Sequence, residues 1–373
     1  MKKKILVCFG TRPEAIKMCA LVHTLKRTDY DVEVCVTAQH REMLDQVLEF
    51  FEITPDYDLD IMKPSQSLNE LSSRIFMKMD EVLLKASPDL VLVHGDTTTS
   101  SICAWAAFHR GVKVGHVEAG LRTFDKYSPF PEEANRQITG RLADFHFSPT
   151  TTSEENLLAE KTNHESIVVT GNTVIDSLLW TVSKLESGYS NDKIEMLTTT
   201  VDFSKKVILV TGHRRENFGD GFLNICKSLA HIATNHDVEI IFPVHLNPNV
   251  QEPVMRLLAD YKNIHLIEPL DYPSFVYMMM KSYLIITDSG GVQEEAPSLG
   301  KPVLVMRDTT ERPEAVAAGT VKLVGTDFDA ITSSAAELLN GGELYAKMSA
   351  AYNPYGDGKA NDRIVDYIKR QLG

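Results

Sequence analysis

The stretch KILVCFGTRPEAIK, residues 4–17, decides the fold class of this chain. After Lys4, residues 5–9 are apolar and rich in β-formers, a pattern typical of a buried strand in a parallel sheet. Gly10 then permits a tight turn, and Pro13 suits the first turn of a helix. The stretch therefore predicts a strand that leads directly into a helix, as in a β-α-β unit.

The same plan recurs along the chain, where short β-branched runs alternate with longer amphipathic stretches. The candidate strands fall into two sets, residues 4–9, 32–37, 90–94, 112–117, 145–148 and 167–170, then 207–211, 238–243, 264–267, 284–287, 303–305 and 321–323. With 373 residues the chain can bury two cores. The prediction is an α/β protein with two doubly wound, Rossmann-like domains.

Composition places the domain boundaries. Residues 187–200 are polar and lack a firm period, so they predict a linker. The expected domains are 1–185 and 186–356, followed by a C-terminal helical segment, 357–373, that crosses back to the first domain. A turn-rich stretch, 353–358, precedes this last helix.

Charge and cysteine usage exclude several classes of protein. The net charge of −13 argues against general nucleic-acid binding. The apolar run 5–9 is too short for a signal peptide, and no stretch approaches the ~20 apolar residues of a membrane span. Five scattered cysteines indicate reduced thiols without a disulfide framework or a zinc site. We therefore expect a cytoplasmic protein that binds neither nucleic acid nor membrane.

Reactive residues gather where predicted strands end. These segments are 10–14, 38–41, 95–99, 118–122, 212–216, 245–248, 288–291 and 307–312. In open α/β sheets ligands bind outside the carboxyl ends of the strands, so the sequence predicts a site at this edge.

The glycine motifs favour a diphosphate over a dinucleotide. Neither the G-x-G-x-x-G fingerprint nor a Walker lysine pattern is present, which removes the main support for NAD and for a P-loop. Gly290 and Gly291 at a helix start would let backbone N–H groups approach a diphosphate, with Glu294 or Glu295 near a ribose. A plain strand-to-helix turn is the alternative at this motif and at Gly10.

Three carboxylates, Asp96, Glu118 and Glu132, are the candidate acid and base groups, although Asp96 could instead cap a helix. His213 could contact a diphosphate or simply end its strand.

Arginines supply the candidate cations. Arg12, Arg307 and Arg312 could bind phosphate oxygens, with surface salt bridges as the alternative. Gln39, His40 and His245 lie on loops after different strands, so we predict no metal site.

Six motifs together resemble the bacterial non-hydrolysing UDP-N-acetylglucosamine 2-epimerases, and the similarity runs over nearly the whole chain. They are GTRPEAIK (10–17), HGDT (94–97), VEAGLRT (117–123), PEEANR (131–136), TGHRRE (211–216) and TDSGGVQEE (287–295). The resemblance implies a glycosyltransferase-B type of fold, with a nucleotide sugar held between the domains. It implies interconversion of UDP-N-acetylglucosamine and UDP-N-acetylmannosamine through elimination and re-addition of UDP, without a cofactor, for surface polysaccharide synthesis.

The resemblance also implies roles for individual residues. Proton transfer and oxocarbenium stabilisation fall to Asp96, Glu118 and Glu132, and His213 assists departure of UDP. The implied substrate and UDP contacts, with Phe275 near the uracil, are Arg12, Lys17, Phe275, Ser289, Gly290, Gly291, Glu295 and Arg312.

Allosteric activation by the substrate and a homodimer are further implications of the resemblance. The matching allosteric residues are Gln39, Glu132, Arg214 and His245. A further basic contact of the family is missing near Ser65, which puts the strength of regulation in question.

Three alternatives stay open on the sequence: a glycosyltransferase of the same fold, a hydrolysing epimerase, and a nucleotide-sugar sensor without activity. The presence of all four candidate catalytic residues argues against the sensor.

Overall fold

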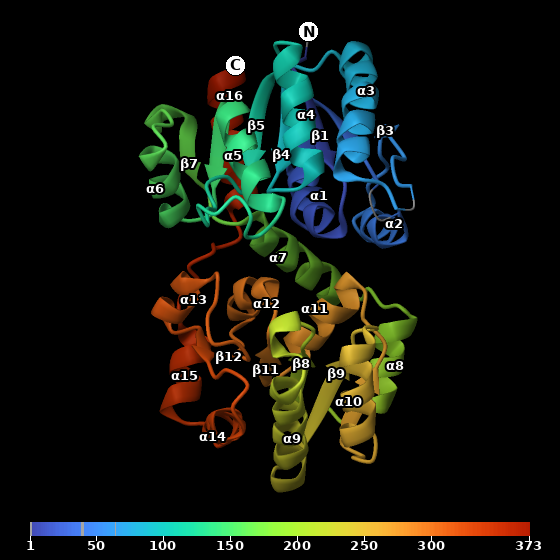
Figure 1. Cartoon of the computed structure of the whole chain (residues 1–373), viewed down its shortest axis with the longest axis vertical. Coiled ribbons are helices and arrows are strands. Elements are labelled where there is room, and N and C mark those ends of the chain that lie inside the picture. Colours follow the sequence, from blue (N-terminus) through green and yellow to red (C-terminus); the bar gives the residue numbers. More distant parts are fainter. Residues whose placement is uncertain (1, 39–40, 64) are drawn as a thin grey trace. The chain divides into compact units, whose positions relative to one another are not determined.

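The computed structural model describes residues 2–38, 41–63 and 65–373. They divide into two compact units, unit 1 with Met1–Leu179 and Tyr355–Gly373, and unit 2 with Trp180–Pro354 (Figure 1). The chain passes from unit 1 to unit 2 within helix α7 (Thr173–Glu186) and rejoins unit 1 at Tyr355.

The described part of unit 1 holds a seven-stranded parallel sheet in the order β3-β2-β1-β4-β5-β6-β7. Its strands are β1 (Lys4–Phe9), β2 (Asp31–Val36), β3 (Tyr57–Asp58), β4 (Leu90–His94), β5 (Lys113–Val117), β6 (Phe145–Ser148) and β7 (Ile167–Val169). Ile5 of β1 pairs with Val32 and with Leu90, which makes β1 a central strand.

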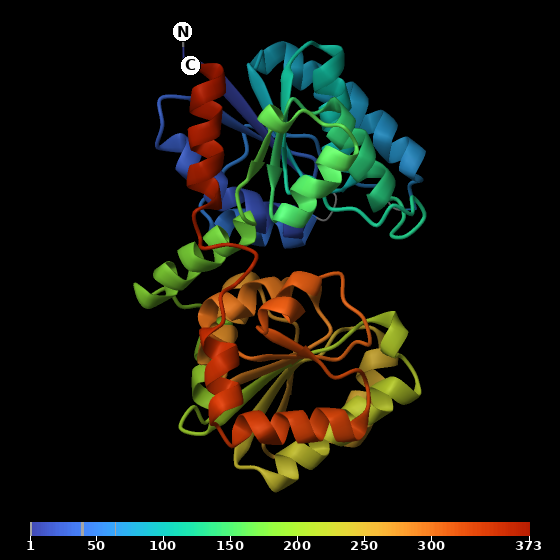
Figure 2. The same cartoon turned by 90° about the vertical axis from the view of Figure 1, so that its left-hand side faces the viewer.

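The helices of unit 1 cover both faces of this sheet. They are α1 (Arg12–Lys26), α2 (Arg41–Phe50), α3 (Leu68–Ala86), α4 (Thr98–His109), α5 (Glu132–Leu142), α6 (Thr151–Ala159), the short 3-10 turn η1 (His164–Ser166) and α16 (Ala360–Leu372). The core beneath α3 and α4 joins them to β1, β4 and β5. Helix α16 lies beside α1, and Figure 2 shows it on the other side of the sheet.

The described part of unit 2 holds a six-stranded parallel sheet in the order β10-β9-β8-β11-β12-β13. Its strands are β8 (Lys206–Thr211), β9 (Val238–Pro243), β10 (Ile264–Ile267), β11 (Leu284–Thr287), β12 (Val303–Val305) and β13 (Val321–Leu323). The two doubly wound sheets predicted from the sequence are therefore present, and every predicted strand occurs within one residue of its expected ends.

The helical elements of unit 2 follow the same alternation. They are α8 (Asp192–Thr200), η2 (Arg215–Asn217), α9 (Asp220–Asn235), α10 (Pro248–Leu258), α11 (Tyr272–Lys281), α12 (Gly290–Glu295), η3 (Ala296–Leu299), α13 (Pro313–Ala318), α14 (Phe328–Leu339) and α15 (Glu343–Ala350). Its core joins α9, α10 and α14 to the sheet.

Two elements differ from the sequence expectation. The predicted linker contains α8, because the Asn191 side chain caps the amide of Ile194 and the helix buries Ile194 and Leu197. The two-residue edge strand β3 carries too few residues for a periodic signal. The part of the chain that the structure describes has no helix long and apolar enough to span a bilayer.

Strand order fixes where a ligand can bind. In each sheet the order reverses beside the first strand, between β1 and β4 in unit 1 and between β8 and β11 in unit 2. At such a switch point the loops that follow the two strands diverge and leave a crevice at the carboxyl edge.

Candidate functional site

Asp96 lies at the switch point of unit 1, directly after β4. Its Oδ2 accepts two hydrogen bonds from Arg136 of α5, from Nε at 3.0 Å and from Nη2 at 2.6 Å. Asn135 donates from Nδ2 to the Asp96 carbonyl at 2.9 Å. The N-cap of α4 is Thr97, so Asp96 is not the helix cap that was the alternative reading. Its 27% exposed carboxylate is instead held by a cation beside the crevice.

Glu118 follows β5 and has a φ of +63°, a left-handed conformation that is unusual for a residue with a Cβ. Its Oε2 is paired with Lys17 of α1 and accepts a hydrogen bond from Asn172 Nδ2 at 3.0 Å. This backbone conformation, together with Lys17 of α1 and Asn172 of the loop after β7, holds the carboxylate at the carboxyl edge of the sheet.

His94, the last residue of β4, is buried between these groups. Its Nε2 is 3.7 Å from Glu118 Oε2, and neither ring nitrogen has a hydrogen-bond partner among the described residues. Burial lowers the pKa of His94 to about 4, against the pull of the Glu118 charge. The imidazole is therefore neutral at neutral pH.

Glu132 begins α5 and is partly exposed. Its neighbour Glu133 is fully buried and accepts hydrogen bonds from the amides of Thr123 and Phe124 and from Arg136. Thus Glu133 fixes the loop after β5, while the described residues offer the Glu132 carboxylate no hydrogen bond or ion pair.

Glu14 is a buried carboxylate that the sequence reasoning did not single out. Its Oε2 accepts from the amides of Gly10 and Thr11 and from the Thr11 hydroxyl, and its Oε1 accepts from Thr97 Oγ1 at 2.7 Å. It therefore ties the loop after β1 to the loop after β4. The signal for it is the Thr-x-x-Glu spacing of a capping box.

His213 and Asp288 lie at the switch point of unit 2, after β8 and β11. Asp288 is fully buried, and its Oδ2 accepts hydrogen bonds from the amides of His213 and Arg214, both at 2.8 Å. The His213 ring stacks on His245, with centroids 5.2 Å apart and planes 14° apart. Burial lowers the pKa of His213 against the opposing charge of Asp288.

Ser289, Gly290 and Gly291 form the turn into α12. A Cβ built on Gly290 would lie 3.8 Å from Arg214 Nη2 and 4.0 Å from Arg312 Nη2, so the glycine borders two guanidinium groups. The Arg312 guanidinium forms an ion pair with the Glu294 carboxylate. Glu295 accepts a hydrogen bond from Tyr272 Oη at 3.0 Å.

The remaining predicted residues are placed as follows. Arg12, half-buried, is the first residue of α1, and half-buried Phe275 lies on α11. Arg307 is 5% exposed and donates hydrogen bonds to Glu216 and Glu311, as in the salt-bridge alternative. Of the expected allosteric residues, Arg214 and His245 both adjoin His213, whereas Gln39 lies outside the described residues, as does His40.

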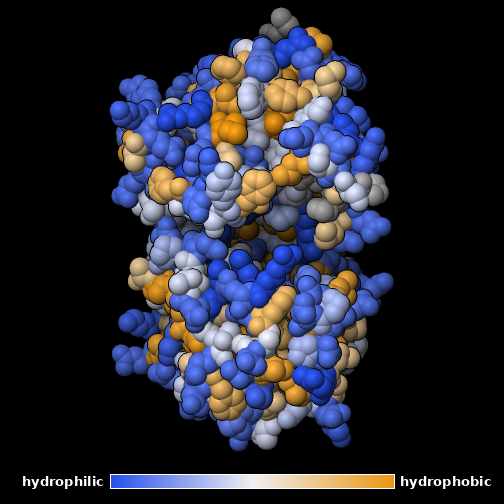
Figure 3. All heavy atoms as spheres, in the orientation of Figure 1, coloured by the Kyte–Doolittle hydropathy of each residue, from blue (hydrophilic) through white to orange (hydrophobic). Residues whose placement is uncertain are grey.

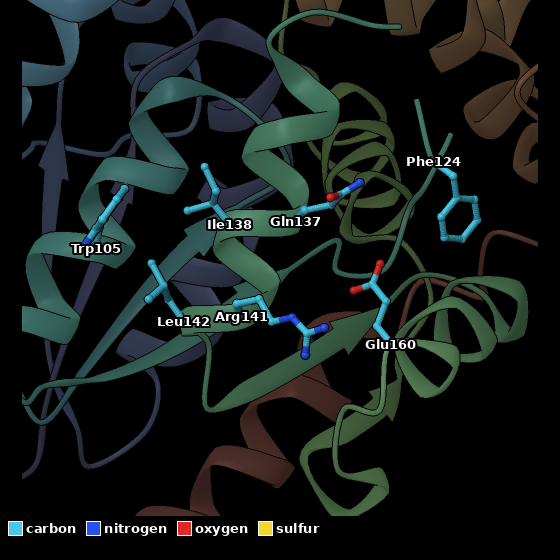
Figure 4. Close-up of a pocket in the computed structure, with 7 residues that line it drawn as sticks. All are labelled: Trp105, Phe124, Gln137, Ile138, Arg141, Leu142 and Glu160. Atoms are coloured by element: carbon cyan, nitrogen blue, oxygen red, sulfur yellow. The ribbon is translucent and has the colours of Figure 1, made fainter. Parts of the chain in front are cut away.

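A separate groove of about 510 Å³ lies on unit 1 between α4, α5 and the loop after β5 (Figure 4). It is lined by Trp105, Phe124, Gln137, Ile138, Arg141, Leu142 and Glu160. Its lining includes none of the three candidate carboxylates. It also includes neither Arg136 nor Lys17, the cations that pair with Asp96 and Glu118. We therefore treat the groove as a surface feature distinct from the carboxylate cluster.

The sequence profile of the UDP-N-acetylglucosamine 2-epimerases matches residues 23–369. A UDP-N-acetylglucosamine 2-epimerase of Escherichia coli is 58% identical over 372 residues, which cover 98% of each chain. The UDP-GlcNAc 2-epimerase of Neisseria meningitidis, solved bound to UDP-GlcNAc, has a TM-score of 0.89 and 52% identity, over 98% of this chain and 100% of that one. S. aureus MnaA, in a co-structure with UDP, has a TM-score of 0.85 and 50% identity, over 99% and 97% of the chains.

Proposed function

The chain belongs to the UDP-N-acetylglucosamine 2-epimerase family, and from that premise we propose that it interconverts UDP-N-acetylglucosamine and UDP-N-acetylmannosamine. It is an isomerase with the two-sheet fold of its solved relatives. The observation that carries the proposal is the pair of carboxylates, Asp96 and Glu118, each held by a cation from another helix at one edge of a parallel sheet.

The proposed reaction breaks the bond between the anomeric carbon and UDP before the stereocentre changes. The C–O bonding electrons leave with UDP, and the resulting oxocarbenium character makes the C2 proton removable by a carboxylate. Loss of that proton gives a 2-acetamidoglucal. Re-addition of UDP, with a proton delivered to the opposite face of C2, completes the epimerisation, so atoms and electrons balance without a redox cofactor.

We assign the proton transfers and the stabilisation of the cation to Asp96, Glu118 and Glu132, with His213 assisting the departure of UDP. The proposed UDP contacts are Arg12, Lys17, Phe275, Ser289, Gly290, Gly291, Glu295 and Arg312. The guanidinium groups beside Gly290 support this assignment, because bidentate arginines suit phosphate oxygens.

Substrate activation is a further part of the proposal. Arg214 and His245 adjoin His213, so a second nucleotide sugar that touched them would act next to the leaving-group site. Glu132 and Gln39 complete the proposed allosteric set.

We also propose that the chain acts as a homodimer and supplies surface polysaccharide synthesis from the cytoplasm. Large apolar side chains exposed on α3, α4 and α5 support the dimer, and Figure 3 shows apolar side chains gathered over α4 and α5. The five cysteines are free and buried, which suits a reducing compartment.

Incubation with UDP-N-acetylglucosamine alone in deuterium oxide tests the activity. We expect the manno isomer to appear with one deuterium at C2 in both epimers at equilibrium. Release of free N-acetylmannosamine would indicate a hydrolysing enzyme, and transfer to an added sugar acceptor without C2 exchange would indicate a glycosyltransferase. Binding of UDP with neither product would indicate a sensor.

A further inference from the structure

Asp288, directly after β11, is a buried carboxylate that uses only one of its two oxygens. Its Oδ2 is saturated by the amides of His213 and Arg214, with Asn217 Nδ2 a further donor at 3.4 Å. Its Oδ1 is equally buried but has no hydrogen-bond partner among the described residues. A buried carboxylate oxygen without a hydrogen-bond donor lowers the stability of the fold. We therefore expect Oδ1 to have a donor when the protein is active.

The nearest candidate donor is the imidazole of His213. Its Nδ1 is 3.7 Å from Asp288 Oδ1, just beyond hydrogen-bonding distance. The backbone of His213 is already fixed by Oδ2, so a small rotation of the 46% exposed side chain would close the gap. The same carboxylate would then hold both the main chain and the ring of one residue.

We propose that Asp288 is a positioning residue that accepts the Nδ1 proton of His213 and so points the Nε2 proton of that ring toward the departing UDP. This inference rests on the proposed function of His213. The pairing fixes the tautomer and favours the imidazolium form, as a carboxylate does for a catalytic histidine. In the forward step Nε2–H donates to a diphosphate oxygen, and on re-addition it recovers that proton.

The other charged or titratable groups facing His213 oppose the carboxylate. His245 is stacked on its ring, and Arg214 follows it in the chain with its guanidinium beside Gly290. Both lower the pKa of His213, whereas Asp288 raises it. Burial lowers the pKa of His213 further, and Asp288 is the charge that opposes these effects.

The test uses the difference between the two carboxylate oxygens of Asp288, since Oδ2 accepts two amide hydrogen bonds and Oδ1 accepts none from the described residues. In Asp288→Asn the amide oxygen should take the Oδ2 place, since two amides donate there, leaving the NH₂ group opposite His213 Nδ1. The loop is retained while the acceptor for Nδ1 becomes a donor. We expect kcat to fall by about 10- to 100-fold, the range seen when a second residue orients a functional histidine. The Kd for UDP should stay within about 3-fold.

A double variant separates positioning from a structural role. If Asp288 acts through His213, then His213→Asn with Asp288→Asn should have the kcat of His213→Asn alone within about 3-fold. A further drop, or loss of UDP binding together with a lower melting temperature in Asp288→Asn, would overturn the proposal. Unchanged kcat in Asp288→Asn would overturn it as well.

A measurement that does not depend on activity keeps the two proposals apart. In ¹⁵N-histidine spectra of the wild-type protein with UDP, we expect neutral His213 to be the Nδ1–H tautomer, and we expect its pKa to be lower in Asp288→Asn, because the opposing charge is lost. An Nε2–H tautomer with a bare Nδ1 would contradict the pairing whatever the activity. Absence of epimerisation with the expected spectra would instead contradict only the proposed function.

Discussion

At the scale of single residues, the candidate site of unit 1 is a set of carboxylates, two of which are held by cations from other helices. Arg136 of α5 reaches Asp96, and Lys17 of α1 reaches Glu118. These ion pairs fix where each carboxylate lies at the carboxyl edge of the sheet, which suits the proposed removal of a proton from carbon.

Replacing Asp96 by Asn should leave the fold intact, because the amide oxygen still accepts from Arg136. It cannot take a proton, so we expect kcat to fall by at least about 100-fold while the Kd for UDP changes by less than about 3-fold. Coupled assay of epimer formation and calorimetry with UDP measure the two quantities. The matched control is Asp80→Asn, since exposed Asp80 makes a similar two-point bond to Arg110. Near-normal turnover of Asp96→Asn would remove Asp96 from the mechanism.

Glu14 couples stability to pH. Burial raises the pKa of Glu14 from 4.5 to about 7, so the folded protein holds this proton more tightly than the unfolded chain does. The contribution of Glu14 to the free energy of unfolding is therefore largest below about pH 5 and declines as the pH rises to about 7. In Glu14→Gln the NH₂ group can donate to Thr97 Oγ1 while the amide oxygen keeps the bonds to Gly10 and Thr11.

Urea unfolding of wild type and Glu14→Gln at pH 5 and pH 8 isolates this contribution. Between the two pH values the variant should gain about 2 to 3 kcal/mol relative to wild type, at 1.36 kcal/mol per pKa unit. The buried histidines His94 and His116, whose pKa values burial lowers to about 4 and about 3, destabilise the fold toward acid in both proteins. Their effect cancels in the difference, and a constant difference would refute the shift at Glu14.

Sequence reasoning named the acidic residues but not what holds them. Asp96 and Glu118 could be found because a charged residue directly after a buried strand is a strong signal. Arg136 could not be assigned as the partner of Asp96, nor Asp288 as the partner of His213. The two pairs are 40 and 75 residues apart and meet only through the sheet order. For Arg307 the sequence left phosphate binding and a salt bridge open, because one of its acidic partners, Glu216, is 91 residues away in the chain.

At the scale of elements, the central strands were predictable because they are short, apolar and buried on both faces. Ile5 to Phe9 are fully buried, as are Leu90 to Val93. Helix α8 was missed because only two of its nine residues, Ile194 and Leu197, are buried. The helical period of apolar residues is therefore weak in the sequence. Local sequence thus identified the strands of both sheets except the two-residue β3, while short elements with few buried side chains depend on tertiary contacts.

The start of α16 depends on a side chain from α7. The N-cap of α16, Lys359, makes no side-chain cap, and Asp176 takes this role by accepting from the amides of Ala360 at 3.2 Å and Asn361 at 2.9 Å. Asp176→Ala should lower the free energy of unfolding by about 1 to 2 kcal/mol, the cost of a lost cap. Hydrogen exchange should rise first in the opening turn of α16.

Asp176→Asn is the matched control, because it keeps one of the two acceptor oxygens. We expect its stability to lie between those of wild type and Asp176→Ala. If both variants exchange like wild type through residues 360–364, the cap does not hold the helix, and the contacts of Arg363 with Thr170 and of Tyr367 with Glu165 must suffice.

At the scale of the whole molecule, one chain builds two sheets of the same design, and each places its functional loops at its own switch point. Unit 1 offers carboxylates there, and unit 2 offers a histidine, two arginines and a glycine turn. The residues that follow each strand were readable in the sequence, so candidate groups could be named for both units. The strand order that brings them together at a switch point comes from the structure.

Exposed apolar side chains on helices α3 and α4 of unit 1 lead to a prediction about how two copies of the chain associate. Phe108 on α4 is 56% exposed and Met77 on α3 is 68% exposed, and these two helices lie side by side. Large apolar side chains that remain in water cost hydration free energy, which a second copy of the chain would recover by covering them. A charge buried in such an interface without a partner is strongly unfavourable.

Phe108→Asp should therefore raise the dimer Kd by at least about 100-fold, as measured by light scattering across a dilution series. Met255→Asp is the control, because Met255 is similarly exposed, at 54%, on α10 of unit 2. Equal masses for wild type and Phe108→Asp at every concentration would show that this face is not the one that joins two copies.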